Sequence, residues 1–283
     1  LIPIGFEQQG YAVSSSIYPT IMIVMSPVSA YLYKTLSIST LFIIIGILTI
    51  IAATFELFIT NIHNGKTGEK FRFQEYKSDL IGGFTFLKEE EGIRNIYTYM
   101  SITNGAANGL HLMVQAYFQT ASFLTVTMLA FLRSAETVGR IIGGFVQYKV
   151  DVPPEKRYGI TKFVYLFYET MDMILLFIPY PFMIVNRFVC GFLGMTSATL
   201  RETSVQSYLP SNMRAKVNAV FNMFISLSII VFQIIAGYLG DRIGYRNTVV
   251  LITIFSLLSV FIFIVRPTEE NRKVYEATRI KEI

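Results

Sequence analysis

The sequence predicts an all-α polytopic membrane protein, a bundle of helices that crosses a lipid bilayer several times. Of the 283 residues, 53% are hydrophobic and 15% are charged, whereas an ordinary soluble domain carries about 25% charged residues. The apolar residues gather in stretches near the roughly 20 residues that a helix needs to cross a hydrocarbon core about 30 Å thick. Helix is the expected form, because a segment within lipid has to satisfy its own backbone hydrogen bonds.

The composition also limits the chemistry that the chain can carry. One cysteine, Cys190, excludes an internal disulfide framework and a cysteine-cluster metal site. Two histidines, His63 and His111, are too few for a histidine-based metal centre. The sequence contains no Walker-type nucleotide-binding loop. We therefore expect no metal, no cofactor and no nucleic acid partner.

The apolar stretches predict about eight membrane-spanning helices. The predicted spans are residues 16–33, 38–59, 96–118, 122–146, 160–178, 181–204, 217–239 and 248–265. The first residue, Leu1, is not a methionine, and residues 1–10 lack the basic and small-residue features of a signal peptide. We therefore expect a fragment that lacks its N-terminal part.

Lysine and arginine concentrate in alternate connections, which indicates the orientation of the spans. They are frequent in residues 61–95, in the connections after the fourth and sixth spans, and in the tail. The opposite connections hold only Lys34, Arg242 and Arg246. Because positively charged connections stay on the cytoplasmic side, we expect a multi-pass protein of the inner (plasma) membrane with a cytoplasmic C-terminus.

The long connection at residues 61–95 contains a helical pattern in its second part. Leu80, Phe84 and Leu87 recur at helical spacing, with Lys77 and Lys88 on either side of them. The pattern favours an amphipathic helix on the inner face of the membrane. An ordinary connector remains the alternative.

Three segments carry longer motifs: Arg140-Ile141-Ile142-Gly143-Gly144 followed by Pro153-Pro154-Glu155-Lys156-Arg157, Asn186-Arg187-Phe188-Val189-Cys190-Gly191, and Leu209-Pro210-Ser211-Asn212-Met213-Arg214-Ala215. With them the chain resembles the major facilitator superfamily, in particular its drug- and macrolide-efflux-type subgroup. The resemblance covers essentially the whole chain, aligned with the last eight of twelve helices. It implies helices five and six in residues 1–60, the loop between the halves in 61–95, the C-terminal six-helix half in 96–266 and a cytoplasmic tail in 267–283.

A loop motif of that family, Gly-x-x-x-Asp-Arg-x-Gly, is matched by Gly237, Asp241, Arg242 and Gly244. In the family the motif lies on the cytoplasmic side, whereas the charge pattern places this turn on the outer side. We interpret the match as a turn of similar composition.

Polar side chains follow one face of the third span at steps of three and four residues. Such a stripe is costly in lipid, so it is expected to face protein or water. The resemblance places this helix beside the central cavity, where the stripe forms a hydrogen-bonding wall for substrate; contacts between helices are the alternative. The stripe comprises Asn104, Asn108, His111 and Gln115, and the seventh span adds Asn222 and Ser226.

Five of the ionisable residues inside the predicted spans are candidates for proton coupling or charge relay. Arg133 and Glu136 are spaced i,i+3 and are expected to pair, either to couple charge or to fix packing. Glu169 and Asp172 have the same spacing. Two carboxylates so near to each other are not expected to be ionised at the same time. For Arg187 the resemblance implies a link to proton transfer, and an arginine of the outer interface is the alternative.

The sequence and the resemblance together predict secondary active transport, by proton-coupled export of a small amphiphilic molecule through alternating access. We expect a bacterial antiporter that acts as a monomer in its full-length form, with a small-molecule substrate, the proton and the lipid bilayer as partners. The neutral stripes suit amphiphilic or weakly basic molecules better than sugars or phosphates. A membrane-embedded enzyme and a non-transporting scaffold remain as alternatives, and no enzymatic activity is expected.

Overall fold

A computed structural model of the chain describes residues 35–56 and 73–278, with single positions between residues 9 and 32. These described residues form helices and no strand. α6 continues into a short 3₁₀ turn, Leu175–Phe177, and α9 into a π-helical segment, Val260–Val265. The helices are α2 (Ile38–Glu56), α3 (Phe73–Glu89), α4 (Glu91–Thr120), α5 (Val126–Lys149), α6 (Pro154–Ile174), α7 (Tyr180–Tyr208), α8 (Ser211–Ile243), α9 (Tyr245–Ser259) and α10 (Thr268–Tyr275).

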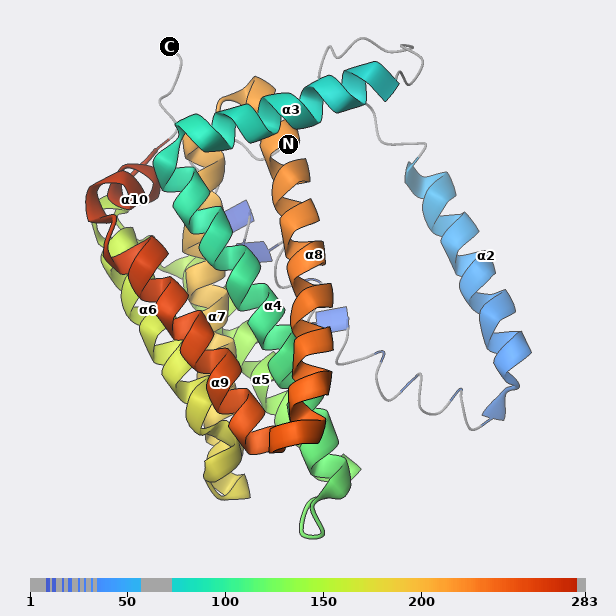
Figure 1. Ribbon diagram of the computed structural model, residues 1–283. Coiled ribbons are helices and arrows are strands. Elements are labelled where there is room, and N and C mark those ends of the chain that lie inside the picture. The colour runs from blue at the N-terminus through green and yellow to red at the C-terminus, as the bar shows by residue number, and fades with distance from the viewer. Residues whose placement is uncertain are drawn as a thin grey trace.

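Helices α4 to α9 run up and down beside one another as a helical membrane bundle (Figure 1). Within it α5 packs on α7, α4 packs on α8 and α9, and α6 packs on α7 and α9. α2 lies apart from the bundle (Figure 1), with apolar side chains such as Phe42 and Phe55 exposed. The predicted helices from residue 96 onward are confirmed, and most begin several residues earlier than the apolar stretches because their ends are polar.

The apolar character of the predicted spans is less uniform than expected. Among the described helices, three are long and apolar enough by themselves to cross a membrane: α7, α8 and the combined stretch Tyr245–Val265. α4, α5 and α6 fall short because they carry polar and charged side chains, among them Asn104, Arg133 and Glu169. The predicted span at residues 16–33 lies largely outside the described residues.

Glycines bring α5 and α7 close together. A Cβ added to Gly139 would lie 2.1 Å from the carbonyl oxygen of Phe188, and one added to Gly191 would lie 2.0 Å from that of Glu136. No side chain fits at either position while the backbones keep this distance. Gly143 on α5 also meets α7, with an added Cβ 2.7 Å from the carbonyl oxygen of Phe192, so glycines on both helices set their close approach.

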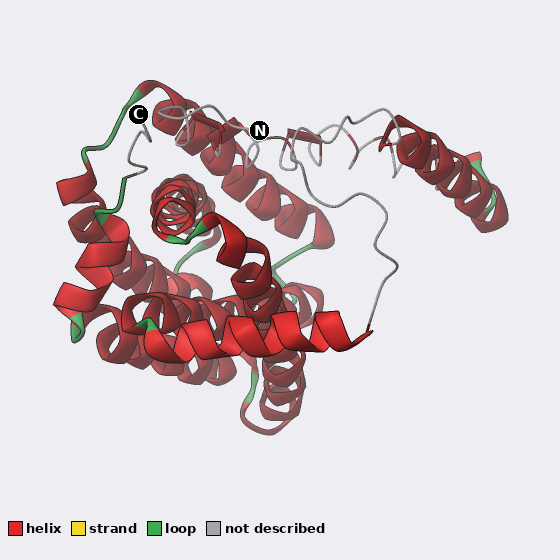
Figure 2. Cartoon of the chain, turned by 90° about the horizontal axis from the view of Figure 1, so that it is seen from above, coloured by secondary structure: helices red, strands yellow, loops and turns green. Residues whose placement is uncertain are grey.

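α3 lies across one end of the bundle, as the view from above shows (Figure 2). Leu87 is buried there, and Asp79 Oδ1 forms an ion pair with Lys216 Nζ on α8 at 2.8 Å. The predicted helix in the second part of residues 61–95 is thus confirmed. The first part of that connection, at residues 61–72, lies outside the described residues.

The two ends of the bundle differ in charge. The end that carries α3 also holds the α5–α6 and α7–α8 connections, with Lys149, Lys156 and Arg214. The α8–α9 turn lies at the opposite end (Figure 1), where Gly244 adopts a φ of 83°. The motif at residues 237–244 therefore lies away from the basic connections, as the charge pattern predicted.

Candidate functional site: a charged cavity between α4, α5 and α7

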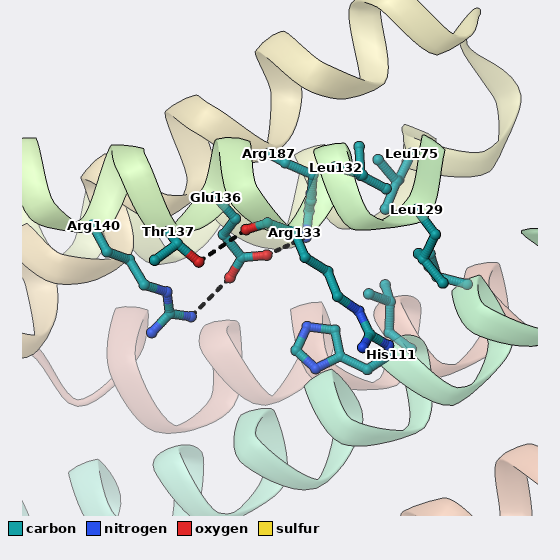
Figure 3. Close-up of a pocket in the computed structure, with 11 residues that line it drawn as sticks. His111, Leu129, Leu132, Arg133, Glu136, Thr137, Arg140, Leu175 and Arg187 are labelled. Carbon is teal, nitrogen blue, oxygen red and sulfur yellow. Dashed lines mark hydrogen bonds and ion pairs between the residues drawn. The ribbon is translucent and has the colours of Figure 1, made fainter. Parts of the chain in front are cut away.

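A cavity of about 500 Å³ opens between α4, α5 and α7 (Figure 3), and two of its lining residues, His111 and Arg133, are exposed. Part of its lining is aliphatic and part is polar and charged, which suits an amphiphilic molecule. The aliphatic lining residues are Leu110, Val114, Leu129, Leu132 and Leu175. The polar lining residues are His111, Arg133, Glu136, Thr137, Arg140 and Arg187.

Glu136 lies between two guanidinium groups. Its Oε1 accepts a hydrogen bond from Arg140 Nη2 at 2.8 Å, and its Oε2 lies 4.0 Å from Arg187 Nη1. The side chain is buried, at 8% exposure. Arg140 follows Glu136 by four residues, the favourable order for an acid and a base on one helix face.

The expected pair between Arg133 and Glu136 does not form. Arg133 Nη2 instead donates to Gln115 Oε1 on α4 at 2.9 Å, and its guanidinium lies on the His111 side of the cavity (Figure 3). Arg140, four residues after Glu136, replaces Arg133 as the partner of Glu136. Glu136 pairs with Arg140, four residues on, and not with Arg133, because Arg133 reaches across to α4.

Arg187 is buried in the protein, at 3% exposure, and is not an arginine of the outer interface. Its Nη2 pairs with Asp172 on α6, and its Nε and Nη2 donate to Asn186 Oδ1 at 3.0 and 2.8 Å. Asn186 is itself held by a hydrogen bond to the carbonyl of Met171 at 2.9 Å. Arg187 thus links α6, α7 and α5 through charge.

Glu169 and Asp172 do not share one site, although they are three residues apart. Asp172 faces Arg187, whereas Glu169 Oε1 accepts hydrogen bonds from Thr103 on α4 at 2.7 Å and Ser256 on α9 at 2.6 Å. The two carboxylates therefore have different bonding partners. The two side chains point to different helices, because three residues turn a helix by less than one full turn.

The polar stripe of α4 is only partly a cavity wall. His111 lines the cavity and Gln115 reaches it through Arg133. Asn104 and Asn108 donate instead to carbonyl groups of their own helix, those of Met100 and of Asn104. Asn222 and Ser226 are exposed on α8 and do not line this cavity.

Sequence reasoning missed two contributors to the site. Arg140 and Asn186, which orients Arg187, were noted only as parts of motifs. The position of Asn186 next to Arg187 in the sequence could have indicated its role.

Among the described residues, no cluster of three or more histidine, cysteine, aspartate or glutamate side chains could hold a metal ion. Cys190 is a free, buried thiol whose sulfur lies 3.4 Å from Arg187 Nη2.

Residues 157–281 match a family model described as the Major Facilitator Superfamily. The match begins near the start of α6 and includes Glu169, Asp172 and Arg187. No curated protein and no solved structure matches the chain. Over this stretch, which is less than half of its length, the chain is similar to the Major Facilitator Superfamily, and the similarity supports membrane transport of the major facilitator type.

Proposed function

We propose that the chain is part of a proton-coupled secondary active transporter of the major facilitator type, which exports a small amphiphilic molecule. The observation that carries the proposal is the placement of Glu136. It is the one carboxylate that lines the described cavity, and it lies between the guanidinium groups of Arg140 and Arg187. Ionisable groups at such positions inside membrane spans are candidates for proton relay.

Protonation of Glu136 changes the forces between α5 and α7. As a carboxylate it attracts Arg140 on its own helix and Arg187 on α7. As a neutral acid it loses most of that attraction, which leaves Asp172 as the charged partner of Arg187. Gly139 and Gly191 place no side chain of their own at the points where α5 and α7 meet. Proton binding then biases two arrangements of the bundle, as alternating access requires.

The lining of the cavity supports an amphiphilic substrate. The leucine wall offers contact for an apolar body, and the opposite wall offers His111 and the charged groups for a polar end. We extend this wall along α4 through Gln115, Asn108 and Asn104. On α8, Asn222 and Ser226 are assigned to a second position in the substrate path.

The orientation of the bundle follows from its charged ends. The connections that carry Lys149, Lys156 and Arg214 gather at the end covered by α3, and the C-terminal helix α10 lies at the same end (Figure 1). We assign that end to the cytoplasm of the inner (plasma) membrane, with a monomeric full-length protein. Residues 73–89 then form the amphipathic part of the loop between two halves.

The test is proton movement in proteoliposomes that contain the natural full-length protein. An imposed pH gradient and an internal pH-sensitive dye report proton flux on addition of each member of a panel of amphiphilic compounds. We expect Glu136→Gln to abolish the substrate-dependent flux, because the amide cannot exchange a proton. Glu155→Gln, at an exposed position in the first turn of α6, is the matched control and retains it. Undiminished flux in Glu136→Gln rejects the proposal.

A further inference from the structure

The charges around the cavity do not balance. Three guanidinium groups line it, those of Arg133, Arg140 and Arg187, and only one carboxylate does, that of Glu136. Asp172 stands behind Arg187 and neutralises a second positive charge. Three positive charges against two negative ones leave one cation in excess. Arg133 is that cation, since its hydrogen bond goes to the neutral amide of Gln115 at 2.9 Å.

Arg187 also retains an unused donor. Its Nη1 atom is buried, forms no hydrogen bond with any described residue, and lies 4.0 Å from the nearest Glu136 oxygen. Buried donors without an acceptor are rare, because an unmade hydrogen bond costs about 1–3 kcal/mol or more for a charged group. An acceptor oxygen that enters the cavity is able to satisfy this atom.

The aliphatic part of the lining favours a ligand whose acceptor oxygen is attached to an apolar body. Leu110, Leu129, Leu132 and Leu175 form a continuous aliphatic lining that lacks hydrogen-bonding side chains. A cavity of about 500 Å³ falls within the range of small-molecule sites. The site therefore fits a molecule with an apolar body and one negatively charged end.

We infer that this cavity binds an organic anion, with its carboxylate against Arg133 beside His111 and its apolar body against the leucine wall. Guanidinium groups are well suited to carboxylates, because the fork of N–H donors matches the two oxygens. The inference reverses the preference for weakly basic molecules that the neutral stripes of the sequence suggested. Its role in export rests on the proposed function, whereas binding itself does not.

The experiment compares three probes with the same phenylbutyl body: 4-phenylbutyrate, 4-phenylbutanol and 4-phenylbutylamine. Binding to the natural protein in phosphatidylcholine nanodiscs is measured by calorimetry. We expect the anion to bind most tightly, and Arg133→Gln to weaken its binding by about tenfold or more, which corresponds to about 1.4 kcal/mol. Arg133→Lys keeps the charge and retains part of the affinity. Arg242→Gln, which removes an exposed charge at the end of α8, is the control and leaves affinity unchanged.

Two results overturn the inference: equal or tighter binding of the amine, or unchanged binding of the anion by an Arg133→Gln protein that melts like the parent. The titration is repeated in nanodiscs that contain phosphatidylglycerol. Unchanged affinity supports a free organic anion, whereas loss of binding assigns the site to a lipid headgroup and rejects it as a substrate site. If the anion binds but no compound moves protons, the proposed function fails and the anion site stands. If the amine both binds and drives protons, the transporter stands and the anion site fails.

Discussion

Glu136 and Glu169 are two buried carboxylates of one bundle with different surroundings. Glu136, at 8% exposure, faces two guanidinium groups beside a cavity. Glu169, at 3% exposure, accepts hydrogen bonds from the hydroxyl groups of Thr103 and Ser256 between α4, α6 and α9. Glu136 is the less buried of the two, yet its charge attracts an arginine on a neighbouring helix, Arg187 of α7. Burial alone therefore does not distinguish the two carboxylates, and the partners of each group have to be known.

The largest effect on stability is expected from removal of the shared cation. Arg187→Leu leaves Asp172 buried without its partner and deprives Glu136 of one of two guanidinium groups. Loss of one member of a buried ion pair costs about 3–5 kcal/mol, because the remaining charge stays desolvated. Unfolding in mixed detergent micelles measures the loss. Arg242→Leu, at an exposed position, is the control.

The double variant Arg187→Leu with Asp172→Leu tests whether the loss of stability comes from the unpaired Asp172 charge. If the cost arises from the uncompensated Asp172 charge, replacing both partners recovers part of the stability. A double variant that is as unstable as the sum of its two single variants indicates that packing, rather than charge, holds α6 and α7 together at this point.

A smaller effect is expected where the backbone of Glu136 meets α7. Gly191→Ala places a Cβ 2.0 Å from the Glu136 carbonyl oxygen, so α5 and α7 have to separate. Overpacking of this kind costs about 1–3 kcal/mol, and it also moves Glu136 away from Arg187. Gly159→Ala, where nothing lies within 4 Å of the added Cβ, is the matched control in thermal melting. Equal melting of the two variants argues against close contact of α5 and α7.

The smallest effect is expected at Glu169. Glu169→Gln keeps an oxygen for the hydroxyl groups of Thr103 and Ser256 and removes no guanidinium partner. We expect it to change the free energy of unfolding by less than about 1 kcal/mol, within the net range of one hydrogen bond. Proton-coupled flux is expected to persist. Loss of flux equal to that of Glu136→Gln would erase the distinction between the two carboxylates.

The sequence predicted the helices well and the side-chain partners poorly. Apolar length and helical spacing are local properties, so the helices from residue 96 to 265 were predicted without a structure, and the spacing of Leu80, Phe84 and Leu87 favoured a further helix before them. The partners depend on how the helices rotate against one another. Glu136 had candidate bases on both sides, Arg133 and Arg140, and only the approach of α4 to Arg133 decides between them. Likewise, spacing alone could not direct Glu169 toward α9 while Asp172 faces α7.

The single thiol of the chain gives this bundle a built-in reporter. Cys190 lies one residue before Gly191, fully buried against Arg187 at the contact of α5 and α7. A maleimide cannot reach it in the arrangement described here. We expect a separation of α5 and α7 to expose this sulfur, so the rate of alkylation under a pH gradient, with and without a test compound, would report it without an engineered label.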